Sequence, residues 1–432
     1  MIRDSFCRKL CRISIASLGA ALMSAATAQS GDTLPQAPSY VGEIRRGADG
    51  KLIALPEAEL SMQKRWGDAA PKATMRVGSG EKISTLTEAA RLARDGEVIE
   101  IRPGNYRGQP VVWTQDNLLI RGVGERPVML ADGRSAEDKA TWVVRGGHVR
   151  IENIEFRGAR ASHANGAGIR FERGELTVHG CRFADNEMGI LTANQATMAL
   201  TVSDSEFADA PRDARDVHHL LYVGAIGKFV LRGSRFQNGY LGHLVKSRAR
   251  ENHILYNMLV DGATGRASYE LEFPNGGIAY VIGNVIGQSA GTDNPSLVAF
   301  GAEGQRWPEN ALYLAHNTLL NDAHAGSFLS VWADRFAGGV DVWAINNLSV
   351  GNGNFFQPAQ GRFEGNRAVG RGELIEYAGV PSRLANLSPL RGSVRVPGRG
   401  GEMDLLPTAE FVAPAGTRPV RVSSALSPGA FQ

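Results

Sequence analysis

The sequence of 432 residues is poor in cysteine. It has three, and two of them, Cys7 and Cys11, lie close to its start, so Cys181 is the remaining thiol of the later chain. One thiol excludes an internal disulfide framework. Cys181 occupies an apolar position of a repeat, and we therefore expect a small buried side chain there, not a nucleophile.

Net charge is also low. The formal charge is +3, and the first 28 residues carry all of it, because they hold four basic residues and one acidic residue (4 − 1 = +3). A near-neutral remainder excludes attraction of acidic partners by an overall positive field, and no nucleic-acid-binding module is recognisable. Nucleic-acid binding is therefore not expected, and an acidic partner would need a local cationic patch.

Long apolar runs are absent as well. The stretch 13–26 is apolar but diluted by serine and alanine, follows a basic start, and ends in small residues at Ala26 and Ala28. This three-part pattern is typical of a secretory signal peptide, whereas the alternative, a membrane anchor, needs a longer span. We expect residues 1–28 to be cleaved, the protein to be periplasmic or secreted without a membrane span, and the mature chain to be a monomer.

The rest of the chain divides by pattern into three parts. Residues 29–76 are mixed and rich in proline, which predicts a linker or loosely packed arm. Over 84–95, Thr85 and Glu88 form a capping box before apolar residues at helical spacing, which predicts one short helix. Repeats fill most of 77–360, and 361–432 loses the period, as expected of an irregular segment packed on the repeats.

The repeats share an apolar alternation, a small or amide residue, and a second apolar alternation. Their anchors recur every 24 to 33 residues: Asn153, Gly180, Asp204, Gly233, Asn257, Asn284, Asn317 and Asn346. Such a period defines a solenoid, and period-2 alternation predicts strands. A leucine consensus or the longer period of propeller blades is missing. We therefore predict an all-β fold, a right-handed parallel β-helix solenoid whose N-terminal end is capped by the short helix.

Two phrases carry a resemblance to a known superfamily. "ISTLTEAARLARDGEVIEIRPGNY" followed by "LLIRGVGERPVML" resembles the start of the pectate-lyase-like β-helix proteins, over residues 77 to about 355. The final "SALSPGAFQ" is similar to the ending of exported bacterial β-helix proteins. The superfamily includes lyases, hydrolases, epimerases and non-catalytic adhesins, so the resemblance implies a fold more than a function.

Equal distances from the anchors predict which side chains stack. The residues 11 positions before three successive anchors are Tyr222, Lys246 and Phe273, and those 14 positions before them are His219, His243 and Glu270. Arg248 and Asn275 lie alongside. Because neighbouring turns are about 4.8 Å apart, these groups would meet on one small surface. His243 and Lys246 differ in strand parity, so both face solvent only if the strand bends between them.

This set of residue types suits β-elimination from a polysaccharide that contains uronic acid. The reaction needs a cation on the substrate carboxylate, a base for the adjacent proton and an acid for the departing oxygen. Arg248 and Arg250 would bind the carboxylate, because guanidinium pairs with it bidentately. Lys246 would be the base, and Tyr222, His219 or His243 the acid. Glu270, Glu272 and Asn275 would contact substrate.

The phrase "KSRARENHILYN" resembles the lysine-bearing motif of the chondroitinase B and alginate lyase family. Lys246 and Ser247 match its Lys-Ser, Asn257 matches its asparagine, and the resemblance implies that Lys246 abstracts the proton. That family has an Arg-His pair in the next turn, where this chain has "SYELEFPNGG". The resemblance to this family suggests calcium as a cofactor. Glu270, Glu272, Asp293 and Asn294 offer oxygen ligands for it, but their spacing is not diagnostic.

Other interpretations stay open. A charge run on a solenoid is often a solvated face. Two carboxylates, Glu270 and Glu272, would suit a glycoside hydrolase, and a binding or adhesion solenoid would need no catalysis. Three histidines lie inside repeat strands and suit structural roles: His179, His253 and His316. The anchor asparagines suit ladders of side-chain amides stacked from turn to turn. Tryptophans 307, 332 and 343 would line a sugar groove or pack in the core.

Overall fold

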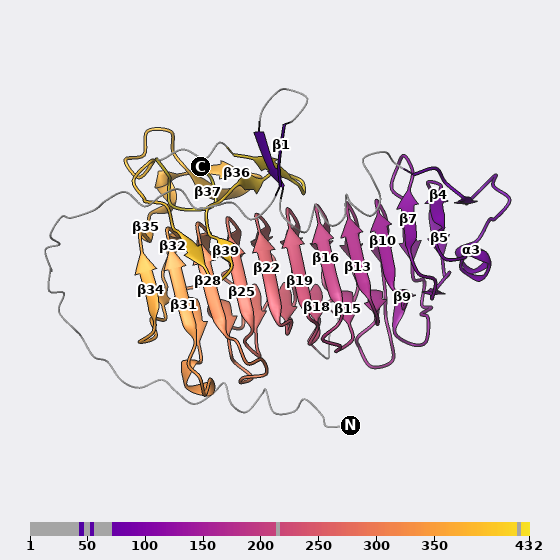
Figure 1. Cartoon of the computed structure of the whole chain (residues 1–432), viewed down its shortest axis with the longest axis horizontal. Helices are drawn as coiled ribbons and strands as arrows, with labels where there is room; N and C mark the ends of the chain where they lie inside the picture. The colour runs from indigo at the N-terminus through magenta and orange to yellow at the C-terminus, as the bar shows by residue number, and fades with distance from the viewer. Residues whose placement is uncertain (1–42, 47–51, 56–70, 213–216, 421–424) are drawn as a thin grey trace, which may run out of the picture. The chain divides into compact units, whose positions relative to one another are not determined.

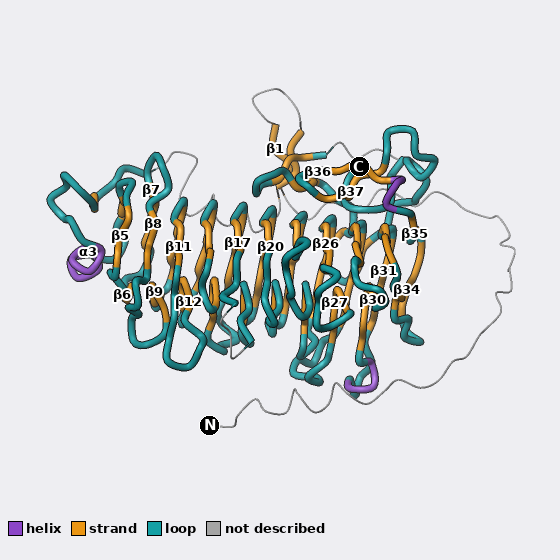
Figure 2. The backbone as a smooth tube through the Cα atoms, turned by 180° about the vertical axis from the view of Figure 1, so that it is seen from behind, coloured by secondary structure: helices purple, strands orange, loops and turns teal. Residues whose placement is uncertain are grey.

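The computed structural model describes residues 43–46, 52–55, 71–212, 217–420 and 425–432. The expected signal segment and most of the expected linker lie outside these residues. Within them, the chain winds into stacked turns, and each turn adds one strand to each of three parallel sheets (Figures 1 and 2). The predicted all-β solenoid, a parallel β-helix, is confirmed.

The sheets have 12, 11 and 10 described strands. The 12-stranded sheet contains β3 (Met75–Val77), β4 (Val98–Ile101), β7 (Leu118–Gly122), β10 (His148–Glu152), β13 (Glu175–His179), β16 (Ala199–Ser203), β19 (Lys228–Arg232), β22 (Glu251–Leu255), β25 (Ile278–Ile282), β28 (Ala311–Ala315), β31 (Asp341–Ile345) and β34 (Gly361–Glu364). The 11-stranded sheet contains β5 (Asn105–Arg107), β8 (Val128–Leu130), β11 (Glu155–Arg157), β14 (Arg182–Ala184), β17 (Glu206–Ala208), β20 (Arg235–Gln237), β23 (Met258–Val260), β26 (Val285–Gln288), β29 (Thr318–Asn321), β32 (Leu348–Gly351) and β35 (Arg367–Val369). The 10-stranded sheet contains β6 (Val111–Trp113), β9 (Ala140–Val144), β12 (Ala167–Phe171), β15 (Met188–Thr192), β18 (Leu221–Val223), β21 (Val245–Ser247), β24 (Leu271–Phe273), β27 (Ser296–Phe300), β30 (Ser327–Val331) and β33 (Asn354–Phe355).

Shorter elements flank the sheets. Four antiparallel strand pairs are described: β1 (Glu43–Arg46) with β2 (Leu52–Leu55), β36 (Leu374–Tyr377) with β37 (Val380–Leu384), β38 (Arg399–Gly400) with β39 (Met403–Asp404), and β40 (Ala409–Phe411) with β41 (Thr417–Pro419). The described helical elements are α3 (Leu86–Leu92), η1 (Ala333–Arg335) and η2 (Arg371–Glu373). Helix α3 begins after Thr85, whose hydroxyl accepts from the Glu88 amide, and it contributes Leu86 and Ala89 to the core. No helix among the described residues has the length and apolarity that a membrane crossing requires.

The interior is filled by inward side chains that repeat from turn to turn. Six aromatic rings follow one another at centroid distances between 4.5 and 5.5 Å: Trp113, Trp142, Phe156, Phe183, Phe207 and Phe236. Cys181 is buried in the same hydrophobic core, and burial raises the pKa of its thiol to about 12. The expectation of a small buried side chain at Cys181 is therefore confirmed.

The corner between the 12- and 11-stranded sheets contains two adjacent columns where the sequence predicts one. Left-handed backbone occurs at Asn153, Gly180, Asp204, Gly233, Tyr256, Gly283, His316 and Asn346. The following residues form the hydrogen-bonded ladder: Cys181, Ser205, Ser234, Asn257, Asn284, Asn317, Asn347 and Asn366. The expected anchors mix the two columns, because glycine, asparagine and aspartate favour left-handed backbone and asparagine also builds amide ladders. The ladder role is confirmed for Asn257, Asn284 and Asn317 but belongs to Asn347, not Asn346.

The segment after the repeats packs on the outside of two sheets. Val380, Phe411 and Phe431 are buried against apolar side chains of the 11-stranded sheet, and Leu405 and Ala409 against those of the 12-stranded sheet. Figure 1 shows the β36–β37 hairpin over the C-terminal half of the stack. The main sheets also continue past residue 360, because β34 and β35 add a further rung to two of them.

Candidate functional site

A polar column crosses the outer face of the 10-stranded sheet. Tyr222 pairs in register with Lys246, and Lys246 pairs with Glu272. The expected neighbours Tyr222 and Lys246 are thus confirmed, but Glu272, not Phe273, is the third member. The turn 274–277 before β25 has one residue more than the turn 248–250 before β22, so counting back from the anchor is wrong by one.

A bend places His243 on the same side as Lys246. The two residues between them, Leu244 and Val245, are both fully buried in the interior, which a regular strand would not allow. Leu244 precedes β21, which begins at Val245. His243 and Lys246 therefore both point outward, although their sequence separation is odd.

Lys246 and Arg248 hold one carboxylate between them. The Lys246 ammonium lies 2.9 Å from Glu303 Oε1, and Arg248 Nη2 donates to the same oxygen at 2.9 Å while Nη1 contacts Oε2. Glu303 belongs to the loop 301–310 between β27 and β28. We call Lys246 and Arg248 the carboxylate clamp. The side chains of Lys246 and Arg248 are 12 % and 20 % exposed, whereas the side chain of Glu303 is 40 % exposed.

A second carboxylate, Glu272, lies beneath the clamp. Its Oε2 is 3.3 Å from the Lys246 ammonium and 3.0 Å from His243 Nε2, and the side chain is buried. Burial alone would raise the pKa of Glu272, but these two contacts outweigh it and lower the pKa to about 2. Burial would likewise lower the pKa of Lys246, yet Glu272 and Glu303 outweigh it, so the pKa is raised. Lys246 is therefore an ammonium at neutral pH.

Both histidines of the cluster are neutral. His219 Nδ1 accepts the amide of His243 at 2.9 Å, and His243 Nδ1 accepts the amide of Tyr269 at 3.1 Å. Each ring therefore carries its proton on Nε2, and Nε2 of His243 lies 3.0 Å from Glu272 Oε2. Burial lowers the pKa of both imidazoles. A second proton would cost each ring its amide hydrogen bond, which argues against either histidine as the acid.

Tyr222 lies at the edge of the clamp. Its hydroxyl oxygen accepts from Arg248 Nε at 2.9 Å, and the Lys246 nitrogen and the Arg248 guanidinium carbon are each 5.7 Å from its ring centroid. The ring also meets His219 edge to face, at 5.2 Å between centroids. Two cationic side chains therefore lie next to one phenol.

Glu270 is not part of this surface. It directly precedes Leu271, which pairs with Val245 and Val298, so it lies level with the interior residues Leu244 and Leu297, and its own side chain is fully buried. Neither of its carboxyl oxygens has a hydrogen-bond partner. Burial, reinforced by Asp261, raises the pKa of Glu270 well above its ordinary value. The prediction that Glu270 contacts substrate is wrong, because the bend that turns His243 outward turns the next position inward.

Of the remaining predicted residues, some contact the clamp and others lie away from it. Asn275 accepts from Arg248 and fixes its guanidinium, and the Trp307 indole donates to the Arg248 carbonyl at 3.0 Å. Arg250 is exposed and pairs with Glu309 at 3.4 Å, on the same loop as Glu303. Trp343 lies on the 12-stranded sheet, where it meets Tyr313 edge to face.

The structural histidines take part in local contacts. His179 is 3.0 Å from Ser203 Oγ, and His253 pairs with Glu251. His316 is buried in the corner column, and burial lowers its pKa to about 4. None of these three contacts the clamp residues, as expected of side chains inside repeats.

Sequence reasoning missed Glu303. It stands in a loop outside the repeat, so no column predicts it. The available signal was length, since the loop lies within the longest anchor spacing, the 33 residues from Asn284 to Asn317.

Three of the four residues that offer oxygen ligands for calcium are otherwise engaged or enclosed. Glu270 is interior, Glu272 is bound to Lys246 and His243, and Asp293 pairs with Arg266 at 3.2 Å. Among the described residues there is no group of three or more acidic, histidine or cysteine side chains arranged to hold a metal.

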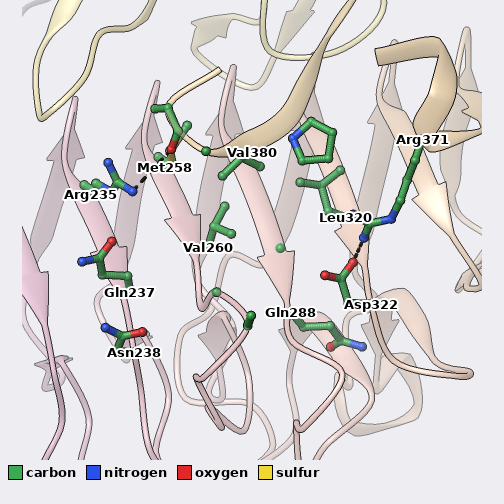
Figure 3. A pocket seen from close by; sticks show the side chains of 16 residues that line it. Arg235, Gln237, Asn238, Met258, Val260, Gln288, Leu320, Asp322, Arg371 and Val380 are labelled. Carbon is green, nitrogen blue, oxygen red and sulfur yellow. Dashed lines mark hydrogen bonds and ion pairs between the residues drawn. The ribbon is translucent and has the colours of Figure 1, made fainter. Parts of the chain in front are cut away.

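A groove of about 280 Å³ lies on another face of the molecule (Figure 3). Its floor includes Met258, Val260 and Leu320 of the 11-stranded sheet, and Val380 of the C-terminal hairpin forms part of its wall. Asp322, the acidic side chain in its lining, pairs with Arg371. The groove lacks the free acid and base groups that chemistry needs, so the Lys246 cluster is the better candidate site.

Comparison with known proteins identifies the fold. No protein-family model and no curated protein sequence matches the chain. Among solved structures, pectate lyase Pel9A is similar at 14% identity and a TM-score of 0.50, over 84% of this chain and 97% of that one. Weaker likenesses are a lacto-N-biosidase from Eubacterium ramulus (9% identity, TM-score 0.31, 67% of each chain) and a pectin methylesterase (13%, 0.28, 73% of this chain and 94% of that one). The fold is the right-handed parallel β-helix that the sequence predicts.

Proposed function

We propose that the protein is a polysaccharide lyase that cleaves a uronic-acid-containing polymer by β-elimination at the Lys246 cluster. One observation carries the proposal: Lys246 and Arg248 together bind a carboxylate, that of Glu303, directly beside a phenol. A uronate carboxylate has the same chemistry as the Glu303 side chain. Bound on the clamp, it would lose charge, and the proton on its adjacent carbon would become more acidic.

The protonation state of Lys246 and the position of Tyr222 favour an assignment of roles that differs from the sequence-based one. Lys246 carries a proton at neutral pH, so it suits the acid that protonates the departing glycosidic oxygen. Tyr222, whose hydroxyl accepts from Arg248 at the edge of the clamp, is placed to be the base that removes the proton next to the carboxylate. The carbon–proton and carbon–oxygen bonds break, a carbon–carbon double bond forms, and the leaving sugar gains a hydroxyl.

The hydrolase interpretation loses its pair of carboxylates, because Glu270 is interior and Glu272 is bound to Lys246 and His243. A polymeric substrate does not enter a cell unaided, so the proposal includes action outside the cytoplasm. Support for export is the pattern of residues 1–28. The protein would act on acidic polysaccharides or their oligosaccharides, and the solved pectate lyase supports the same scaffold for such chemistry.

The decisive experiment follows ultraviolet absorbance of unsaturated uronate with alginate, pectate, glucuronan and glycosaminoglycans. We expect wild type to produce the absorbance on one of them, and Lys246→Ala to lose at least about a thousandfold in rate, because it removes both a clamp cation and the acid. Lys228→Ala is the matched control, since Lys228 pairs with Glu251 on the 12-stranded sheet. Reducing ends released without ultraviolet absorbance would instead indicate hydrolysis and reject the proposal.

A further inference from the structure

The clamp is already occupied by the protein itself. Glu303 is the carboxylate that Lys246 and Arg248 bind, and it comes from a loop and not from the sheet that carries the clamp. We propose that Glu303 is an internal ligand that an external carboxylate displaces, so that substrate affinity is set by an exchange of one carboxylate for another. This inference rests on the proposed function for the identity of the substrate, but not for the exchange.

The exposure of the partners supports an exchange. The clamp side chains are mostly buried, and the Glu303 side chain approaches them from the solvent side, where 40 % of its surface is exposed. A glutamate in this position can leave by rotation of its own side chain. The clamp cannot leave with it, because Asn275 and Tyr222 fix Arg248, and Glu272 fixes Lys246.

The loop backbone has its own attachments. The Glu303 amide donates to the Pro274 carbonyl at 2.8 Å, the Arg306 amide to the Asn275 carbonyl at 3.1 Å, and the Trp307 indole to the Arg248 carbonyl at 3.0 Å. These bonds do not involve the Glu303 carboxylate. They therefore keep the loop in place while the side chain exchanges, and they hold the internal ligand close to the clamp.

The charges of the clamp explain why an occupant is needed. Lys246 and Arg248 repel one another, and the Arg248 charge is one of the groups that lower the pKa of Lys246. Contacts with Arg248 and Lys246 outweigh burial and lower the pKa of Glu303, so it binds as an anion. An internal ligand that fills the clamp for about 90 to 99 % of the time weakens external binding about ten- to a hundredfold.

Chemical rescue tests the exchange without any assumption about catalysis. Glu303→Ala empties the clamp and leaves two adjacent cations, so its melting temperature should fall. Acetate, compared with chloride at equal ionic strength and pH 7, should then raise the melting temperature of Glu303→Ala by several degrees more than that of wild type. Glu309→Ala is the control, because Glu309 lies on the same loop but pairs with exposed Arg250. Equal acetate shifts in all three proteins would overturn the proposal.

Glu303→Gln gives a second test that keeps the side-chain shape. We expect uronate oligosaccharides to bind it about ten- to a hundredfold more tightly than wild type in calorimetry, and KM for a cleaved acidic polymer to fall. Weaker or unchanged binding would contradict the exchange. Acetate rescue of Glu303→Ala without unsaturated product from any polymer would support the exchange and reject β-elimination, so the two proposals fail separately.

Discussion

At position 270 a carboxyl group stands where the neighbouring turns have Leu244 and Leu297. It has no hydrogen-bond partner, and Asp261, whose pKa is raised to about 6 by burial, adds a second acidic group to this part of the interior. A buried carboxyl group without a partner is neutral, because burial disfavours its charged form. Glu270 therefore lowers stability whenever the pH favours ionisation in the unfolded chain.

This gives a signed pH dependence. The folded-state pKa of Glu270 is raised, so its contribution is fully present below the unfolded pKa of about 4.3 and is lost as pH rises towards the folded value, at about 1.4 kcal/mol per pH unit. Glu270→Gln should remove that loss and be more stable than wild type at pH 8 but not at pH 4. Urea unfolding at pH 4 and at pH 8 measures this difference in stability, and Glu309→Gln, at an exposed residue, is the control. A lower midpoint for Glu270→Gln at pH 8 would show that the carboxylate is stabilised in the fold.

Residue types alone indicated most of the site, but not the direction of each side chain. Tyr222, Lys246, Arg248 and His243 concentrate in turns that a solenoid stacks, so their meeting was predictable. Glu270 and Glu272 look alike in sequence, yet one is interior and the other lies under the clamp. The bend at Leu244 decides between them, and no residue pattern around it announces a bend.

At the scale of one element, the corner ladder joins successive turns. Asn284 Nδ2 donates to the Ile254 carbonyl at 2.8 Å and to Asn317 Oδ1 at 3.0 Å, and its Oδ1 accepts from the Asn257 amide at 2.8 Å. These groups are buried, so removing the side chain leaves several of them without partners. The repeat period predicted the ladder, but four expected anchors, Gly180, Asp204, Gly233 and Asn346, lie one residue before it, in the adjacent left-handed column.

Asn284→Ala should therefore lower the free energy of unfolding by about 1 to 3 kcal/mol, the cost of leaving buried polar groups unpaired. Denaturant unfolding monitored by circular dichroism is the measurement. Asn105→Ala, at an exposed asparagine of β5, is the matched control and should change stability by less than about 0.5 kcal/mol. Equal losses in both variants would mean that the ladder adds nothing beyond strand propensity.

At the scale of the whole molecule, the end of the chain covers the outside of the solenoid. Phe431 is 6% exposed, packs edge to face on Tyr377 at 5.3 Å between centroids, and lies 4.5 Å from the guanidinium carbon of Arg383. The apolar cluster around it includes Val285, Leu320 and Leu348 of the sheet beneath. This packing holds the C-terminal segment, which lacks the repeat, against the 11-stranded sheet.

Phe431→Ala should cost about 3 kcal/mol or more, because it leaves a cavity under the final residues. We expect a lower melting temperature together with binding of a hydrophobic dye below the main transition, as the segment lifts from the sheet. Phe356→Ala, at a side chain that is 42% exposed, is the control. An unchanged melting temperature would show that the last residues do not stabilise the solenoid.

The sequence by itself determined the solenoid, its period and the turns that hold the cationic groups, because strand alternation and stacking depend on residue type and spacing, which are local properties. Only the tertiary structure decided which carboxylate faces the site and what occupies the clamp. Those outcomes depend on a bend before β21 and on Glu303, which reaches Lys246 across a separation of 57 residues from a loop outside the repeat. Contacts of that kind follow from three-dimensional packing, and the sequence pattern does not contain them.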